Sequence, residues 1–247
     1  MQSGDLEARV PVDDASEVGL LEAGFNSMAA GLAERERLRD LFGRQVGHDV
    51  ARQALRNGTK LGGEEREVGV LFIDVVGSTS MALAMPPAEV VRLLNLVFRV
   101  VVESAEQHGG LVNKFQGDAA LCVFGAPVAS DDPAGDALCA ARAMADRLPA
   151  EVPQIDFGIG VSAGLAVAGN VGSEQRFEYT VIGDPVNEAA RLSALAKRRD
   201  GGVLSSEAAL RRVRGLEGSE WTLDEFTILQ GRSERTGIAV PSAAAPA

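Results

Sequence analysis

The sequence predicts an α+β domain in which helices pack on one mixed, mainly antiparallel sheet, preceded by a helical segment. Three observations support this fold class. Short apolar runs typical of buried strands alternate with long amphipathic runs typical of helices. A tight hairpin signal joins two of the apolar runs, which favours antiparallel pairing. The stretch before the first strand signal has helical periodicity alone.

Composition limits the classes of function. The 247 residues are 46% hydrophobic, which is ample for a sizeable core. The formal net charge of −11 argues against nucleic acid or an anionic membrane as a partner, because surfaces that bind phosphate carry an excess of Lys and Arg. An acidic chain is compatible with a site for divalent cations. Cys122 and Cys139 lie in apolar runs, and we interpret both as core residues rather than as a disulfide.

The N-terminal residues lack the pattern of a signal peptide, and no apolar run approaches the ~18 residues that a membrane helix needs. We therefore expect a soluble chain with a cytoplasmic location. A place at the cytoplasmic face of the membrane, within a longer membrane-tethered sensor, stays open.

An amphipathic helix is predicted from about Asp14 to Asp40. We interpret it as a helix that pairs with a copy of itself or with other helices, and packing on the domain's own surface is the alternative. Residues 41–55 continue helically, and the glycine-rich, charged residues 56–67 indicate a linker. The apolar positions of the first helix recur at alternating spacings of three and four, as in a coiled-coil seam: Val18, Leu21, Phe25, Met28 and Leu32.

Strands and helices are expected to alternate after this linker. Apolar runs predict the strands, and amphipathic runs that begin near Pro predict the helices. Short strand, helix and strand signals follow, and the low-complexity residues 237–247 indicate a frayed end. The longer strand signals lie at 67–76, 111–115, 119–124, 154–171 and 176–183, and the helix signals at 86–108, 132–148 and 184–199.

Two single aspartates interrupt the apolar runs. Asp74 follows "VGVLFI", and Asp118 follows Gly117 in the hairpin "NKFQGDAALCVF". Taken alone, Asp74 fits a cap or turn residue, and Asp118 fits a two-residue turn. Taken together, they end neighbouring central strands, so we expect their carboxylates to converge. Such a pair suits Mg²⁺, which takes one or two carboxylates and completes its shell with water and substrate phosphates.

A second candidate pair lies on the helix predicted at 184–199. Asn187 and Arg191 are four residues apart, so they share a face, and that face is not the apolar one. In isolation the pair also fits a solvated surface. In the functional interpretation, Arg191 stabilises the negative charge that develops on a phosphate, and Asn187 orients a sugar oxygen.

Three segments, "LFIDVVGST", "NKFQGDAALCVFG" and "YTVIGDPVNEAARL", in this order and spacing, resemble the class III nucleotide cyclase catalytic domain. The earlier segment "VPVDDASEVGLLEAGFNSMAAGLAERERLRDLF" is similar to the C-terminal part of a HAMP signalling module. The resemblance implies a ferredoxin-like, palm-type sandwich. The domain boundaries that we expect are 1–40 for the HAMP-like helix, 41–65 for a helical linker, 66–240 for the catalytic domain and 241–247 for a disordered tail.

The resemblance also implies roles for individual residues. Asp74, Asp118 and the backbone carbonyl of Val75 fall on the ligands of two Mg²⁺ or Mn²⁺ ions per site. Lys114 and Thr180 fall on the two positions that contact the purine. Lys with Thr or Asp at these positions implies adenine, whereas guanylate cyclases have Glu and Cys there, so we expect ATP as the substrate.

Asn187 and Arg191 fall on the family's pair that orients the ribose and stabilises the transition state. Arg232, in "ILQGRSERTG", is the candidate cation for the triphosphate, with Lys197 and Arg198 as alternatives. The resemblance further implies a head-to-tail homodimer, in which one chain supplies the metal ligands and the other supplies the purine and ribose contacts. The expected activity is that of an adenylate cyclase, which forms 3′,5′-cyclic AMP and pyrophosphate. A guanylate cyclase, or a catalytically silent module that binds nucleotide or dimerises, is the alternative.

Overall fold

The computed structural model describes residues 9–12, 17–58 and 60–242. The chain divides into two compact units, Met1–Gly58 and Thr59–Ala247.

The N-terminal unit consists of helices α1 (Glu17–Val46) and α2 (His48–Asn57). Gly47, between them, has a φ of 89°, a conformation that glycine adopts without strain and that interrupts the predicted helical continuation. The apolar seam of α1 is largely exposed in the single chain, with Leu21 at 74% and Met28 at 62%. Its pairing with a second copy therefore stays a prediction. Among the described residues, no helix is both long and apolar enough to cross a membrane.

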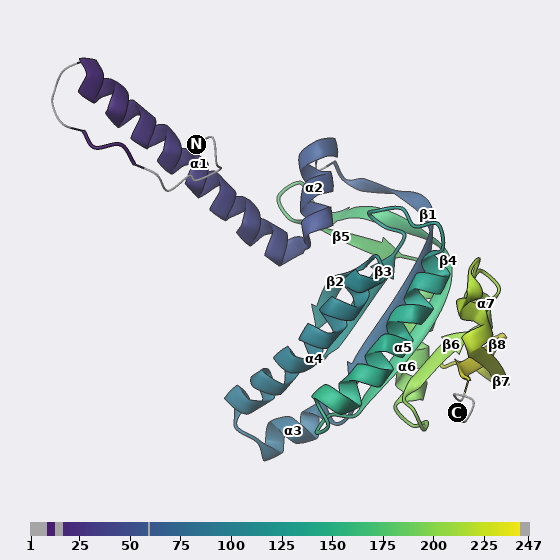
Figure 1. The fold of residues 1–247 in the computed structure, drawn as a ribbon. Coiled ribbons are helices and arrows are strands. Elements are labelled where there is room, and N and C mark those ends of the chain that lie inside the picture. The colour runs from purple at the N-terminus through teal and green to yellow at the C-terminus, as the bar shows by residue number, and fades with distance from the viewer. Residues whose placement is uncertain (1–8, 13–16, 59, 243–247) are drawn as a thin grey trace. The chain divides into compact units, whose positions relative to one another are not determined.

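The second unit is built on one eight-stranded sheet (Figure 1). Seven strands run in the order β2-β3-β1-β4-β6-β8-β7, and β5 pairs with β4. Only β4 and β6 pair in parallel among the described strands, so the predicted mixed, mainly antiparallel α+β fold is confirmed. The strands are β1 (Gly62–Val75), β2 (Gly110–Gln116), β3 (Ala119–Phe124), β4 (Phe157–Gly172), β5 (Phe177–Ile182), β6 (Val203–Ser206), β7 (Trp221–Ile228) and β8 (Arg235–Pro241).

Helices cover both faces of this sheet because its central strands bury alternate residues on each side. Leu71 and Ile73 of β1 pack with apolar residues of α4 and α5, which lie side by side in Figure 1. Val68 and Val70 of the same strand share a cluster with Ala189 of α6. The helical elements are α3 (Ser78–Ala84), α4 (Pro87–Gln107), α5 (Pro133–Glu151), α6 (Asp184–Ala196), α7 (Glu207–Leu210) and the 3₁₀ turn η1 (Leu216–Glu220).

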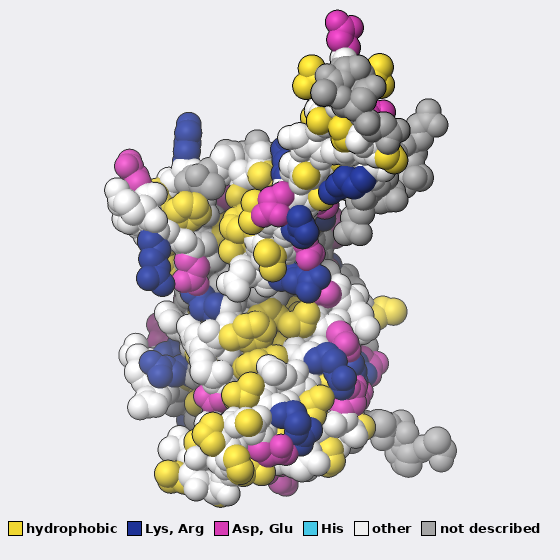
Figure 2. Space-filling model, turned by 90° about the vertical axis from the view of Figure 1, so that its left-hand side faces the viewer, with side chains coloured by type: hydrophobic (Ala, Val, Ile, Leu, Met, Phe, Trp, Pro, Cys, Tyr) yellow, Lys and Arg dark blue, Asp and Glu magenta, His cyan; other side chains and the backbone are white. Residues whose placement is uncertain are grey.

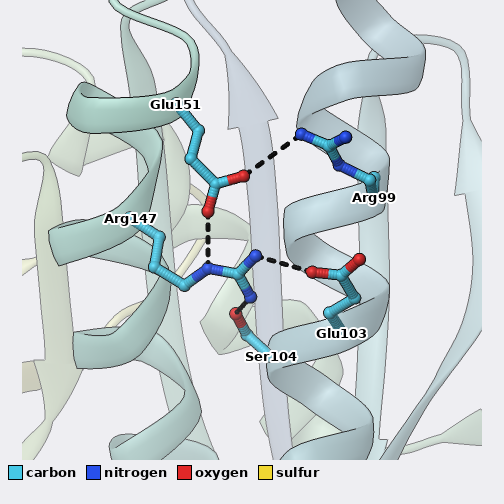
Figure 3. A network of polar contacts seen from close by, with 5 residues as sticks. All are labelled: Arg99, Glu103, Ser104, Arg147 and Glu151. Carbon is cyan, nitrogen blue, oxygen red and sulfur yellow. Dashed lines mark hydrogen bonds and ion pairs between the residues drawn. The ribbon is translucent and has the colours of Figure 1, made fainter.

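Helices α4 and α5 are also joined by a polar network at the surface (Figure 3). Arg147 of α5 donates to Glu103 of α4 at 2.6 Å and to Glu151 on its own helix at 2.8 Å. Arg99 of α4 reaches Glu151 at 3.2 Å. The hydrogen bond from Arg147 lowers the pKa of Glu151. These exposed contacts add to the apolar packing that fixes the two helices.

Two sequence predictions about irregular segments are wrong. Residues 62–67, interpreted as part of a linker, form the start of β1 and pair with β4 from Gly62 opposite Asn170 onward. Residues 237–241, interpreted as a frayed end, belong to β8, in which Ile238 and Ala239 are fully buried. In both cases a partner strand supplies hydrogen bonds that local composition does not reveal: β4, about a hundred positions away, for residues 62–67, and the nearer β7 for residues 237–241. The remaining tail residues, 243–247, lie outside the described residues.

The two cysteines are free, as predicted. Cys122 is buried in β3, and burial raises the pKa of its thiol to about 12.

Candidate active site

The end of strand β1 and the β2–β3 hairpin bring Asp74 and Asp118 onto neighbouring strands. Gly117 has a φ of 68°, as the first position of a type II′ hairpin turn requires, and Asp118 follows it. Because β1 and β3 are antiparallel, Asp74 lies opposite Ala119, the residue after Asp118. The Val75 amide donates to the Asp118 carbonyl at 3.4 Å. Directly opposed residues such as Asp74 and Ala119 have Cβ atoms about 4.5–5.5 Å apart, and Asp118 is the chain neighbour of Ala119.

The donor set at this edge is composed of oxygen atoms. Among the described residues, no group of three or more His, Cys, Asp or Glu side chains forms a metal cluster. Two carboxylates instead match the needs of Mg²⁺, which keeps positions for water and substrate phosphates, and the Val75 carbonyl stays the predicted third ligand. A positively charged side chain contacts one of these carboxylates: the Nζ atom of Lys197 is 2.5 Å from Oδ2 of Asp74. The residues therefore fit a small divalent cation.

The predicted purine residues Lys114 and Thr180 lie on strands β2 and β5. A register shift in the β2–β3 ladder occurs at Asn113, and such irregularities re-aim side chains. The Asn113 amide donates to the Tyr179 carbonyl at 2.9 Å, and its Oδ1 accepts from the Thr180 hydroxyl at 3.3 Å. Lys114 forms an ion pair with Glu178, two residues before Thr180. One chain thus brings the Lys114 and Thr180 segments together.

Helix α6 carries Asn187 and Arg191. It lies close against β4 because three glycines of that strand face it: Gly158, Gly160 and Gly164. A Cβ atom built on Gly160 would lie 2.1 Å from the Ala189 carbonyl oxygen and 2.3 Å from the Ser193 nitrogen. At Gly158 it would lie 2.4 Å from the Ser193 carbonyl oxygen. The helix therefore rests on the strand backbone, and Asn187 and Arg191 stay exposed on its outer side.

Arg232, the predicted triphosphate residue, is ion-paired to the first half of α6. Its guanidinium donates to Asp184 at 2.7 Å, a hydrogen bond that raises the pKa of Arg232, and lies 3.4 Å from Glu188. Glu188 is buried and also accepts from Ser162 at 2.6 Å and from Thr236 at 3.4 Å. In this chain Arg232 thus holds α6 to the strands around it.

Lys197 and Arg191 lie on different sides of α6. Lys197, at the C-terminal end of α6, contacts Asp74. At about 100° per residue, Arg191 lies about 120° around the helix axis from Lys197. Among the ion pairs of the described residues, Asp74 is paired with Lys197 and not with Arg191.

Replacing Gly160 by alanine should destabilise the domain, since the new methyl group meets helix backbone that cannot rotate away. We expect a loss of about 1–3 kcal/mol in the free energy of unfolding, measured by urea denaturation. The matched control is Gly218→Ala, where the nearest atom to the new Cβ is 3.7 Å away. Equal stability of the two variants would contradict the close packing of α6.

Sequence reasoning missed the residues that hold the candidate site residues in place. Glu178 beside Lys114, Asn113 beside Thr180 and the buried Glu188 of α6 carry no local signal. Each has a partner at least 26 positions away along the chain: Lys114 for Glu178, Thr180 for Asn113 and Ser162 for Glu188. Lys197 was named only as an alternative for the triphosphate, and its contact with Asp74 was not predicted.

The family described as the adenylate and guanylate cyclase catalytic domain matches residues 63–237, and the HAMP domain matches residues 1–34. Two uncharacterized proteins of Mycobacterium tuberculosis are 53% and 51% identical to the chain over 241 and 242 residues. These matches cover 98% of this chain but 44% and 45% of those proteins, so the chain spans less than half of their length.

Solved cyclase structures share the fold. The adenylyl cyclase CyaB from P. aeruginosa aligns with a TM-score of 0.66 and 24% identity over 74% of this chain and 98% of its own. The guanylyl cyclase Cya2 aligns with a TM-score of 0.60 and 29% identity over 72% of this chain and 93% of its own. A bacterial light-regulated adenylyl cyclase aligns with a TM-score of 0.72 and 19% identity over 93% of this chain and 65% of its own.

The sheet, its helices and these structural neighbours define the fold of a nucleotide cyclase. The chain belongs to the adenylate and guanylate cyclase catalytic domain family, and it carries a HAMP domain at its N-terminus. The predicted resemblance to both families is thereby confirmed. Catalytic domains of this class generally use divalent metal ions and a nucleotide substrate, and they typically dimerise.

Proposed function

We propose that the chain is an adenylate cyclase, which converts ATP to 3′,5′-cyclic AMP and pyrophosphate in a site shared by two copies. The observation that carries this proposal is the position of Asp118 beside the end of β1, next to Asp74. Within a cyclase fold, this pair offers oxygen ligands for divalent cations where a triphosphate would bind.

In the proposed reaction, the ribose 3′-oxygen attacks the α-phosphorus and the bond to the pyrophosphate oxygen breaks. Asp74, Asp118 and the Val75 carbonyl would hold two Mg²⁺ or Mn²⁺ ions, which supply charge neutralisation and acidify the attacking hydroxyl. Arg191 stabilises the charge that builds on the α-phosphoryl group. Asn187, one helical turn away, orients the ribose, so that the 3′-hydroxyl is in line with the leaving group.

The choice of ATP rests on Lys114 and Thr180. A lysine ammonium has only donors, so Lys114 fits the N1 acceptor of adenine better than the N1–H donor of guanine. The Thr180 hydroxyl both donates and accepts, and therefore accommodates the neighbouring amino group. The hydrogen bond from Thr180 to Asn113, the chain neighbour of Lys114, supports a common site for Lys114 and Thr180.

A second copy of the chain is supported by uncovered apolar surface. Figure 2 shows hydrophobic side chains exposed between charged groups on one face of the molecule. Strands β4 and β5 carry a further set of large exposed apolar residues, with Leu165 at 60% and Ile182 at 57%. Exposed apolar residues that gather on one pair of strands indicate an interaction surface, and docking of a second chain would bury them. The rest of this set is Val167, Val171 and Phe177.

Product identification tests the proposal directly. Incubation with Mn-ATP should yield cyclic AMP and pyrophosphate, whereas Mn-GTP should yield little product. Asp118→Asn should lower the rate at least about 10²-fold, because it removes a charged metal ligand without changing side-chain size. Asp131→Asn, at an exposed position, is the matched control and should leave the rate unchanged.

Two other outcomes would replace this proposal. Formation of cyclic GMP alone would establish the guanylate cyclase alternative, for which structural neighbours such as Cya2 are known. Tight binding of Mg-ATP without any cyclic product would instead identify a silent nucleotide-binding module.

A further inference from the structure

Lys197 lies in a position that the proposed reaction does not explain. It follows the last residue of α6, and its Nζ atom is 2.5 Å from Oδ2 of Asp74. Both side chains are about three-quarters buried, at 25% and 27% exposure. The ammonium thus lies on the carboxylate that is proposed to bind a divalent cation.

Backbone hydrogen bonds at the end of α6 hold Lys197 beside Asp74. The Lys197 amide donates to the Ser193 carbonyl at 3.2 Å, and the buried Ser193 hydroxyl donates to the Gly158 carbonyl at 2.8 Å. Gly158 lies opposite Asp74 in the β1–β4 ladder. Two hydrogen bonds therefore connect the lysine backbone to the strand position beside Asp74.

Gly158 also makes room for the lysine stem. A Cβ atom at Gly158 would lie 2.6 Å from Cγ of Lys197 and 2.8 Å from its backbone nitrogen. Contacts this short do not occur, so any larger residue would displace the stem. The path from α6 to Asp74 is open only because glycine occupies this position.

A divalent cation on the Asp74 carboxylate would lie a few ångströms from the ammonium at Oδ2, and the two positive charges would repel each other. We propose that Lys197 is a resident counter-ion of Asp74, which a divalent cation must displace on binding. Without metal, it offsets the repulsion between Asp74 and the adjacent Asp118. Metal binding then frees the ammonium, and the lost ion pair weakens binding of the metal alone. This inference rests on the proposed metal site.

The test is Mn²⁺ binding without nucleotide, measured by calorimetry on the full chain. Lys197→Met keeps most of the stem but removes the charge, and we expect Mn²⁺ affinity to rise about two- to fivefold. Arg198→Met is the matched control. Arg198 is exposed and forms no ion pair within the described part of the chain, so this variant removes the same charge one residue away.

A second measurement separates competition from a general charge effect. In chelator, Lys197→Met should melt at a lower temperature than Arg198→Met, and added Mn²⁺ should raise its melting temperature more. Lys197→Gln serves as a second variant if the methionine variant does not fold. Equal Mn²⁺ affinity in the Lys197 and Arg198 variants would overturn the inference.

Asp74→Asn separates this failure from failure of the proposed function. If wild type binds Mn²⁺ and Asp74→Asn does not, the metal site stands whatever the Lys197 variants do. If wild type and Asp74→Asn bind Mn²⁺ equally, the metal site itself is wrong, and the role of Lys197 falls with it.

Discussion

Two inactive variants, Asp74→Ala and Arg191→Ala, should regain cyclase activity when they are mixed. Each substitution removes a different part of the site: a metal ligand in one chain and the transition-state cation in the other. In a heterodimer, the Asp74 of one chain and the Arg191 of its partner form one complete site. If the chains mix freely into closed dimers, half of the dimers have one good site of two, so we expect about a quarter of wild-type activity.

The control mixes Asp74→Ala with Asp118→Ala. Both substitutions remove metal ligands, so each site of their heterodimer lacks one ligand and no activity should return. Size-exclusion chromatography with differently tagged chains establishes that heterodimers form. A dead Asp74/Arg191 mixture that contains heterodimers would rule out the shared site.

The second large effect is expected from Lys114→Glu combined with Thr180→Cys. A carboxylate accepts hydrogen bonds where the lysine donated them, which matches the N1–H and amino donors of guanine. The ratio of kcat/KM for ATP to that for GTP should fall by about 10²-fold, since a base that leaves polar groups unpaired is strongly disfavoured. Parallel assays with Mn-ATP and Mn-GTP measure the ratio.

The new carboxylate at position 114 would face Glu178, the present partner of Lys114. A melting curve must therefore accompany the assays, because repulsion between the two carboxylates opposes the contact between β2 and β5. Lys60→Glu, at an exposed position, makes the same charge change and should not alter the ratio. An unchanged ratio in a folded double variant would show that Lys114 and Thr180 do not select the base.

The hairpin was readable from the sequence because its geometry is local. Gly117 and Asp118 between two apolar runs predict a tight turn, and the turn fixes the register of β2 against β3. The Asn187 and Arg191 face of α6 was equally predictable, since a four-residue spacing puts two side chains on one side of a helix.

The strand ends at Gly62–Glu67 and Gly237–Pro241 were not predictable in the same way. Their residues resemble a linker and a tail, and pairing with β4 and β7 makes them strands. Hydrogen-bond partners that lie about a hundred residues away leave no trace in local composition. The same holds for Lys114 with Glu178, 64 positions apart, whose contact depends on β5 folding back over β2.

By itself, the sequence determined the family, the class of fold and the residue types available for metal, base and phosphate, because these depend on motifs and short-range periodicity. The tertiary structure decided which of these groups meet. It placed the Asp118 carbonyl beside the Val75 amide, left Arg191 on the exposed side of α6 and brought the Lys197 ammonium to the Asp74 carboxylate, with the lysine stem against Gly158. The reason is physical: strand register and helix packing are set by contacts between distant segments, and only the folded chain brings those segments together.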